Sequence, residues 1–221
     1  MFLIVNNDHM SQCNDRNSNN DSQCIENALK KLGQNGKIVD SNCAINLTEL
    51  RNFQGILLSG GPWDLTKPLL FGSFKLDIQV MINANVPIYG ICMGHQIMAE
   101  ANGANIGRWP TIYHGEREIE ILDHNGLFEG IPDKISMVEW HQEFVMESPP
   151  GFELTATSAE LYSPFPPISI NNDPEPPSPV KGCKVQALQH KDKKMYSTQF
   201  HPELSGEIGL KILNNFVKLC S

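Results

Sequence analysis

Long apolar stretches are missing from this sequence, and their absence limits where the protein resides. The first apolar run covers only residues 2–5 before three polar residues interrupt it. Such a run is too short, and lacks the basic flank, for a signal peptide, and no window of roughly 18 apolar residues exists for a membrane span. We therefore expect a cytoplasmic protein without a membrane partner.

Positive charge and paired cysteines are also scarce. The chain has 17 Lys and Arg against 25 Asp and Glu, a formal net charge of −8, which argues against nucleic acid or an anionic membrane as partner. The six cysteines form no CxxC or zinc-type pair and are interpreted as reduced thiols, with a Cys13–Cys24 disulfide as a minor alternative. We expect no metal site; zinc held by Cys92, His95 and His201 is the alternative, but their spacing is not that of zinc ligands.

The first half of the chain alternates short apolar runs with helical patterns. With 221 residues the sequence is long enough for one domain, residues 1–221, with a sizeable core. The alternation predicts an α/β fold with a mostly parallel central sheet and helices on both faces. The expected strands are residues 2–6, 37–40, 55–58 and 87–90. The first expected helix is capped by Asp21 or Ser22 and has Ile25, Leu29 and Leu32 on one face. A second helix is expected over about 73–85, burying Phe74, Ile78, Met81 and Ile82.

The second half alternates polar and apolar residues and predicts extra antiparallel strands at the sheet edge. These strands are expected at residues 117–122, 135–140 and 185–188, followed by a packing helix over 206–219. A polar insertion at about 8–23 is predicted to be a loop. A proline-rich surface excursion is expected at about 162–182, because the seven prolines of 164–179 exclude a helix or a central strand.

The sequence Gly90-Ile-Cys-Met-Gly94 follows one of these apolar runs and precedes a helical pattern. Glycines two residues on either side of a nucleophile permit a sharp strand-to-helix turn that leaves the Cys92 side chain clear of the sheet. The helix N-terminus directed at the sulfur favours the thiolate. A buried structural cysteine is the simpler alternative.

Three motifs together resemble those of the class I (triad-type) glutamine amidotransferases. Residues 90–96 resemble the family's nucleophile elbow, Gln199-Phe-His-Pro-Glu203 its second signature and Ser59-Gly-Gly-Pro62 its oxyanion loop. They occur in the family's order and span most of the chain. The resemblance implies the flavodoxin-like fold of this family.

The resemblance also implies a catalytic triad. Cys92 would attack the side-chain amide of L-glutamine to give a thioester and ammonia, and water would then release glutamate. His201 would be the general base and acid, and Glu203 would orient its ring. Alone, a His-Pro-Glu sequence is more often a surface turn. For Gly60-Gly61 the simpler alternative is an ordinary Gly-Gly-Pro turn.

Further site residues follow from the same resemblance. The backbone N–H groups of Gly61, in the Gly60-Gly61 loop, and of Met93 would stabilise the oxyanion. Gln96 would contact glutamine, together with backbone groups around Trp63 and in residues 140–143, which include Trp140 and Gln142. His141 is expected to be a positioning or structural residue and His95 a packing residue.

Within the family, the sequence is most similar to the separate glutaminase subunits of archaeal-type GMP synthases. The supporting stretches are residues 56–62, 149–154, 185–190 and 196–203. Such a subunit would pass ammonia to an ATP-dependent synthetase acting on XMP. No glycine-rich phosphate motif is present, so ATP and Mg²⁺ would belong to that partner and this chain would need no cofactor. The alternatives are a free-standing γ-glutamyl hydrolase or peptidase with the same triad, the glutaminase subunit of another amidotransferase such as anthranilate synthase, and a regulatory protein that has kept the fold.

Overall fold

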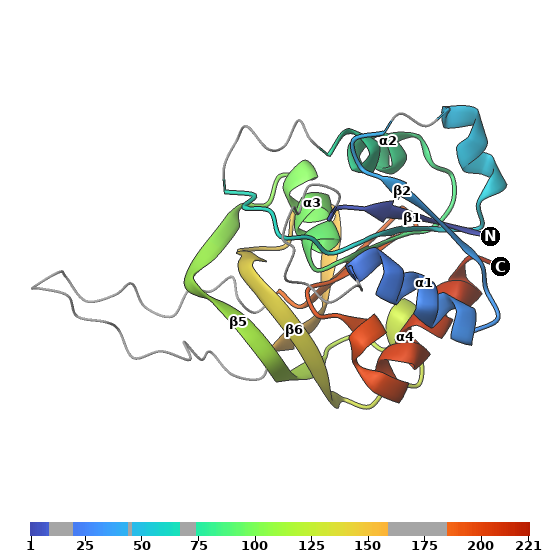
Figure 1. Cartoon of the computed structure of the whole chain (residues 1–221). Helices are drawn as coiled ribbons and strands as arrows, with labels where there is room; N and C mark the ends of the chain where they lie inside the picture. Colours follow the sequence, from blue (N-terminus) through green and yellow to red (C-terminus); the bar gives the residue numbers. More distant parts are fainter. Residues whose placement is uncertain (9–19, 44–45, 67–73, 159–184) are drawn as a thin grey trace, which may run out of the picture.

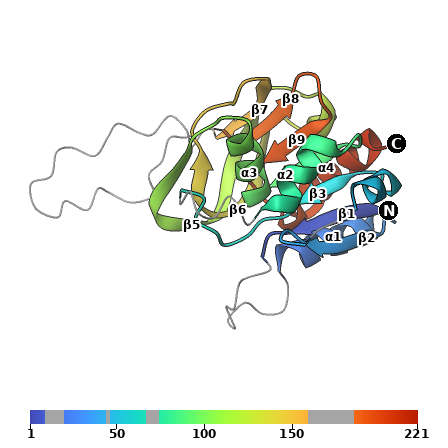
Figure 2. The ribbon, with the colours of Figure 1, turned by 90° about the horizontal axis from the view of Figure 1, so that it is seen from above.

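One mixed sheet of nine strands organises the molecule. The computed structural model describes residues 1–8, 20–43, 46–66, 74–158 and 185–221. The strand order is β2-β1-β3-β4-β9-β8-β7-β5-β6, parallel from β2 to β9 and antiparallel from β9 to β6 (Figures 1 and 2). The strands are β1 (Phe2–Asn6), β2 (Gly36–Asp40), β3 (Ile56–Leu58), β4 (Ile88–Ile91), β5 (Ile106–Ile121), β6 (Lys134–Val145), β7 (Phe152–Ser158), β8 (Ala187–His190) and β9 (Met195–Thr198).

Helices cover both faces of the parallel half. Successive side chains of a strand point to opposite faces, and β1 divides its side chains between two cores: Phe2 and Ile4 pack with α1 and α4, whereas Leu3 and Val5 pack with α2 and α3 (Figure 1). A strand buried on both faces reads as a continuous apolar run, which is why the sequence located it. The α-helices are α1 (Asp21–Lys31), α2 (Lys75–Asn83), α3 (Met93–Ala101) and α4 (Gly206–Leu219), and the 3-10 helices are η1 (Leu47–Asn52), η3 (Gly126–Phe128) and η5 (Pro202–Leu204).

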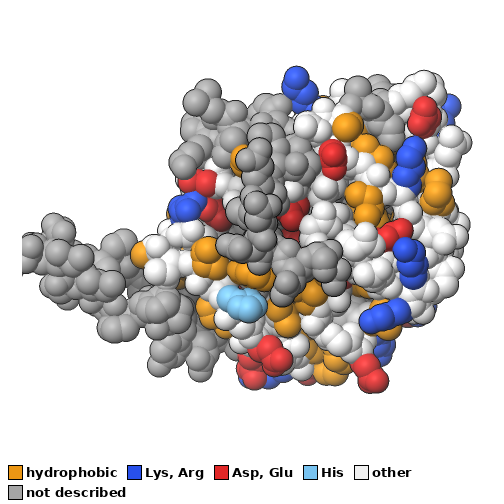
Figure 3. Space-filling view, in the orientation of Figure 1, with side chains coloured by type: hydrophobic (Ala, Val, Ile, Leu, Met, Phe, Trp, Pro, Cys, Tyr) orange, Lys and Arg blue, Asp and Glu red, His pale blue; other side chains and the backbone are white. Residues whose placement is uncertain are grey.

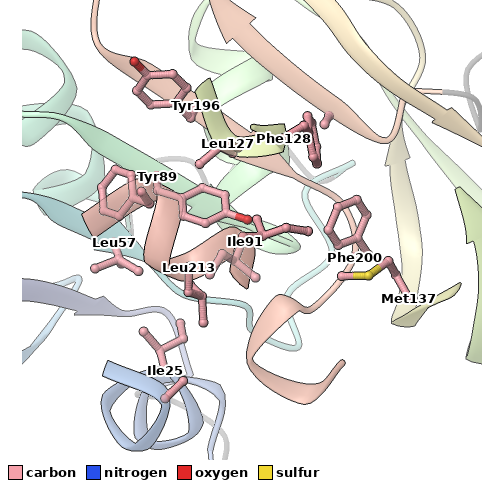
Figure 4. Close-up of a cluster of buried hydrophobic side chains, with 14 of the residues drawn as sticks. Ile25, Leu57, Tyr89, Ile91, Leu127, Phe128, Met137, Tyr196, Phe200 and Leu213 are labelled. Carbon is pink, nitrogen blue, oxygen red and sulfur yellow. The ribbon is translucent and has the colours of Figure 1, made fainter. Parts of the chain in front are cut away.

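One of the two cores lies between the sheet and the helices α1 and α4. Phe216 of α4 is fully buried, with its ring centroid 5.3 Å from that of Tyr89 on β4 and 6.1 Å from that of Phe2 on β1. Figure 4 shows Tyr89, Ile91 and Phe200 in this cluster; Tyr89 and Ile91 are on β4, which precedes Cys92, and Phe200 directly precedes His201. The segments that carry the site are therefore anchored in this core.

The α/β class and the helices on both faces agree with the prediction, and several details correct it. Ile82 is 74 % exposed instead of buried, because α2 buries Leu76 and Val80. The cap of α1 is Asn20, whose side chain accepts from the N–H of Gln23, so the helix begins inside the segment expected to be a loop.

The antiparallel half is larger than an edge. It includes β7, which no pattern indicated, and β5 begins eleven residues before the predicted start at residue 117. Of the predicted polar insertion, residues 9–19 lie outside the described residues. The whole proline-rich excursion expected at about 162–182 also lies outside them, within 159–184. A single domain over residues 1–221 therefore stays a prediction. Among the described residues, no helix is long and apolar enough to cross a membrane.

Candidate active site

Cys92 occupies a strained turn between β4 and α3. Its backbone has φ 52° and ψ −104°, and it is the sole non-glycine residue with positive φ in the described part of the chain. Positive φ costs an L-residue free energy, and such strain concentrates at functional sites. The backbone N–H of Cys92 fixes the turn by donating to the carbonyl oxygen of Thr198 on β9 at 2.8 Å.

The two glycines of the elbow are required by close backbone approach. A Cβ on Gly90 would lie 2.5 Å from the carbonyl oxygen of Gly94, and a Cβ on Gly94 would clash with the carbonyl oxygen of Leu58 on β3. The Gly94 N–H also donates to the Ser59 carbonyl oxygen at 3.1 Å, which ties the elbow to the end of β3. The Gly-x-Cys-x-Gly spacing therefore has the steric cause that the sequence suggested.

His201 and Glu203 lie just beyond β9, the parallel neighbour of β4. Nδ1 of His201 is 2.7 Å from Oε1 of Glu203, and both side chains are inaccessible or nearly so. Because a carboxylate can only accept here, His201 carries a proton on Nδ1, which leaves Nε2 for proton transfer. Nε2 makes no hydrogen bond with any residue that the structure describes.

The thiol and the imidazole are electrostatically coupled. Burial raises the pKa of the Cys92 thiol, and the nearby His201 only partly offsets this. Burial lowers the pKa of His201, but the negative charges of Cys92 and Glu203 outweigh burial and raise the pKa well above its usual value. A proton released by the thiol is therefore held well by His201, as a general base requires.

The predicted oxyanion loop lies against this pair. A Cβ on Gly60 would be 3.1 Å from Cε1 of His201, and a Cβ on Gly61 would be 2.6 Å from the carbonyl oxygen of Asn7. The loop is held by Asn7, whose side-chain amide donates to the Ser59 carbonyl oxygen at 3.0 Å. Met93 begins α3, where N–H groups have no intrahelical acceptor. The N–H groups of Gly61 and Met93 are thus positioned on the two segments that flank Cys92.

Gln96 lies buried on α3, one turn beyond Cys92. Its Nε2 donates to the carbonyl oxygen of Glu143 at 2.7 Å and to Oε1 of Gln199 at 3.2 Å. Gln199 in turn places its Nε2 at 3.8 Å from the Cys92 sulfur. Both amide hydrogens of Gln96 are therefore used, and its oxygen remains as an acceptor.

Trp140 and Gln142 on β6 differ in their relation to the sulfur. The carbonyl oxygen of Trp140 is 3.7 Å from the Cys92 sulfur. Trp140 is 40 % exposed, and its ring lies tilted against that of His114 with centroids 4.5 Å apart. Figure 3 shows one exposed histidine beside hydrophobic side chains on the face of the molecule seen in Figure 1. The Gln142 amide is bonded elsewhere, to Arg108 at 2.7 Å and to the carbonyl oxygen of Trp109 at 2.8 Å. Its contact with glutamine stays a prediction.

His141 and His95 have structural contacts. His141 lies between the carbonyl oxygen of Glu143 (2.8 Å) and the buried Glu139 carboxylate (3.1 Å), which also pairs with Arg117 at 2.7 Å. His95 is fully buried with Nδ1 2.8 Å from the Ser197 hydroxyl, and burial followed by the charge of His141 lowers its pKa to about 3. His95 is therefore neutral in the working range of pH.

Three charged residues of the site were missed by the sequence reasoning. The Asp21 carboxylate lies against Gly60 and raises the pKa of Cys92, Glu139 is the buried partner of His141, and Arg108 joins β5 to the oxyanion segment. Asp21 lies within the predicted polar insertion, and the other two lie on the irregularly paired strands β5 and β6, so no spacing pointed to them. The described residues include no group of three or more His, Cys, Asp or Glu that could hold a metal ion. Cys24 is a free thiol, while Cys13 lies outside the described residues.

Comparisons with known proteins agree with this geometry. The family described as "Glutamine amidotransferase class-I" matches residues 17–165 and 178–220. Relatives named as one subunit of glutamine-hydrolysing GMP synthase include that of Thermococcus kodakarensis, 34% identical over 197 residues (89% of this chain, 91% of the relative), and that of Methanopyrus kandleri, 37% identical over 169 residues (75% of each).

Solved structures show the same fold. A Thermoplasma acidophilum protein, provisionally assigned as the corresponding GMP synthase subunit, has a TM-score of 0.75 at 27% identity, covering 99% of this chain and 92% of that one. A glutamine amidotransferase from Thermotoga maritima has a TM-score of 0.62 at 17% identity, covering 98% and 82%. With the family matched over most of its length, this chain belongs to the class I glutamine amidotransferases.

Proposed function

We propose that this chain hydrolyses the side-chain amide of L-glutamine at Cys92 and passes the ammonia to an ATP-dependent synthetase that aminates XMP. The observation that carries the chemistry is the strained elbow at Cys92, one strand away from the buried His201–Glu203 pair. The choice of acceptor rests on the relatives named as subunits of glutamine-hydrolysing GMP synthase. ATP and Mg²⁺ would be bound by the synthetase and not by this chain, in the cytoplasm.

The first half of the reaction forms a thioester. His201 Nε2 takes the thiol proton and the Cys92 sulfur attacks the amide carbon, forming the C–S bond. The N–H groups of Gly61 and Met93 donate to the oxyanion. When the C–N bond breaks, His201 returns its proton to the departing nitrogen, and NH₃ leaves. Glu203 holds the ring and stabilises its cationic form.

The second half restores the enzyme. A water molecule attacks the thioester carbon while His201 takes one of its protons, the C–S bond breaks, and glutamate leaves as Cys92 regains the proton. Gln96 offers its oxygen to the α-ammonium group of glutamine, because both of its amide hydrogens are already bonded.

The test is glutamate release from glutamine by the purified chain, alone and with an XMP-dependent synthetase, ATP and XMP. We expect low release alone and a large rise with the synthetase. Cys92→Ala should abolish release, while Cys43→Ala, which removes an exposed free thiol, should behave as the native chain. Partner-independent turnover of γ-glutamyl peptides would indicate the hydrolase alternative. Stimulation by another synthetase with its own acceptor would change the pathway, and the absence of any Cys92-dependent release would refute the activity.

A further inference from the structure

Arg108 of β5 joins two segments of the active site that are far apart in the sequence. Its Nη1 lies 2.7 Å from Oδ2 of Asp64 and 2.5 Å from Oε1 of Glu143, and its Nη2 donates to Gln142. Asp64 follows the oxyanion loop, three residues after Gly61. One guanidinium thus connects the oxyanion segment to strand β6.

The β6 side of this cluster leads to the glutamine site. The carbonyl oxygen of Glu143 accepts from Nε2 of Gln96, and Gln96 also contacts Gln199. These contacts lie on regular elements, since Gln96 is in α3 and Glu143 in β6. The oxyanion segment, residues 59–64, has no regular secondary structure. It is therefore held by contacts with its neighbours: Asn7 contacts Ser59 and Trp63, and Arg108 contacts Asp64 on the side of β6.

The electrostatics favour a tether over a simple surface pair. The side chains of Asp64 and Glu143 are only 17% and 11% exposed, against 37% for Arg108, so solvent screens the cluster incompletely. Burial raises the pKa of Glu143, Arg108 opposes this, and the charge of Asp64 adds to it. Without the guanidinium, two carboxylates would face each other and separate the segments that Arg108 holds together.

We propose that Arg108 is a positioning residue for glutamine hydrolysis: it holds the oxyanion segment through Asp64 against Glu143 of β6, and so fixes the Gly61 N–H relative to Cys92 and Gln96. This rests on the proposed function, in which Gly61 binds the oxyanion. Because the tether acts on the segment used in the transition state, its loss lowers kcat. KM changes little, because Gln96 keeps its own contacts on α3 and β6.

The experiment measures glutamine hydrolysis by the full chain and by Arg108→Met, with the synthetase added if it stimulates. We expect kcat to fall about 10- to 100-fold, the effect of a displacement of roughly 1 Å in a catalytic group, and KM to change less than about threefold. Lys134→Met is the matched control, because it removes the Lys134–Glu118 ion pair between the same two strands and should have no effect. Iodoacetamide should alkylate Cys92 at the native rate, since the triad is untouched.

A double-mutant cycle shows whether Arg108 acts through Asp64. Asp64→Asn should lower kcat as Arg108→Met does, and the double variant should be no slower than either single variant. Additive losses, a native kcat in Arg108→Met, or a loss confined to KM would overturn the positioning role. A native chain that releases no glutamate would instead refute the proposed function, so the two failures are distinguishable.

Discussion

Glu203 determines how strongly His201 holds a proton in the active site. Its carboxylate has no exposed surface and lies 2.7 Å from His201 Nδ1. Its negative charge contributes to the raised pKa of His201. His201 can therefore keep the proton of the Cys92 thiol and form an imidazolium–thiolate pair.

Replacement Glu203→Gln should reduce kcat by about 10²- to 10⁴-fold, as in other triads whose orienting carboxylate is neutralised. The pKa of His201 should fall, which destabilises the imidazolium partner of the thiolate. The rate of Cys92 alkylation, measured against pH, should therefore rise only at higher pH than in the native chain. Glu207→Gln, an exposed carboxylate four residues later, is the control. An unshifted profile in Glu203→Gln would contradict this account.

At the level of single residues, the sequence predicted the residues that share a short motif. Cys92 with its glycines, and His201 with Glu203, are each local patterns, and the structure brings both patterns together. Arg108 and Asp21 could not be found this way, because their relation to the site comes from pairing between distant segments. The side-chain amide of Gln142 is bonded to Arg108 and Trp109, and the contact of Gln142 with glutamine that the sequence suggested stays a prediction.

Among the secondary-structure elements, the β4–α3 elbow has little steric freedom. A side chain at Gly94 would meet the backbone of Leu58, and the Gly94 N–H holds the Ser59 carbonyl oxygen. A shift at Gly94 therefore moves Met93 and the oxyanion loop together.

Gly94→Ala should destabilise the fold by about 1–3 kcal/mol, the usual cost of overpacking, and lower kcat by about 10²-fold, because a catalytic donor is displaced. Urea unfolding and glutamate release measure the two effects. Gly115→Ala on β5 is the control, since its Cβ would find its nearest neighbour, the Tyr113 hydroxyl, at 3.6 Å. If Gly94→Ala matched this control in both assays, steric closeness at the elbow would not explain the glycine.

The elements themselves were predictable to different degrees. Buried parallel strands read as apolar runs and were found, whereas β7 mixes buried and exposed positions irregularly and was not. Helix α2 was located, but its buried face was assigned wrongly at Ile82. Apolar residues occur around most of that helix, so the pattern alone does not define which side meets the sheet.

Across the whole molecule, one buried carboxyl makes the stability depend on pH. Asp77 of α2 is fully buried, accepts from the side-chain amide of Asn7 at 3.1 Å, and has its pKa raised by burial from 3.8 to about 7. Between these values the native state binds a proton that the unfolded chain has lost. The free energy of unfolding therefore decreases as pH rises through this window.

Asp77→Asn mimics the protonated carboxyl and should remove this dependence. The free energy of unfolding of the variant, relative to that of the native chain, should increase by about 2–3 kcal/mol as pH rises from 5 to 8. Chemical unfolding of both proteins at pH 5 and pH 8 gives the four free energies of unfolding. A difference between the proteins that is the same at both pH values is the pH-independent effect of the substitution and serves as the internal reference. Two parallel stability curves would mean that Asp77 titrates normally in the native state.

The pairing of β4 with β9 has a consequence for how such an enzyme can change. Nucleophile and base follow directly from two adjacent strands, whose separation of about 4.8 Å is a constant of backbone hydrogen bonding. The sheet therefore determines how the thiol and the imidazole are aligned, while the loops around the sheet can vary in sequence and length. New acceptors can be acquired by remodelling loops and docking surfaces, without redesigning the chemistry that releases ammonia.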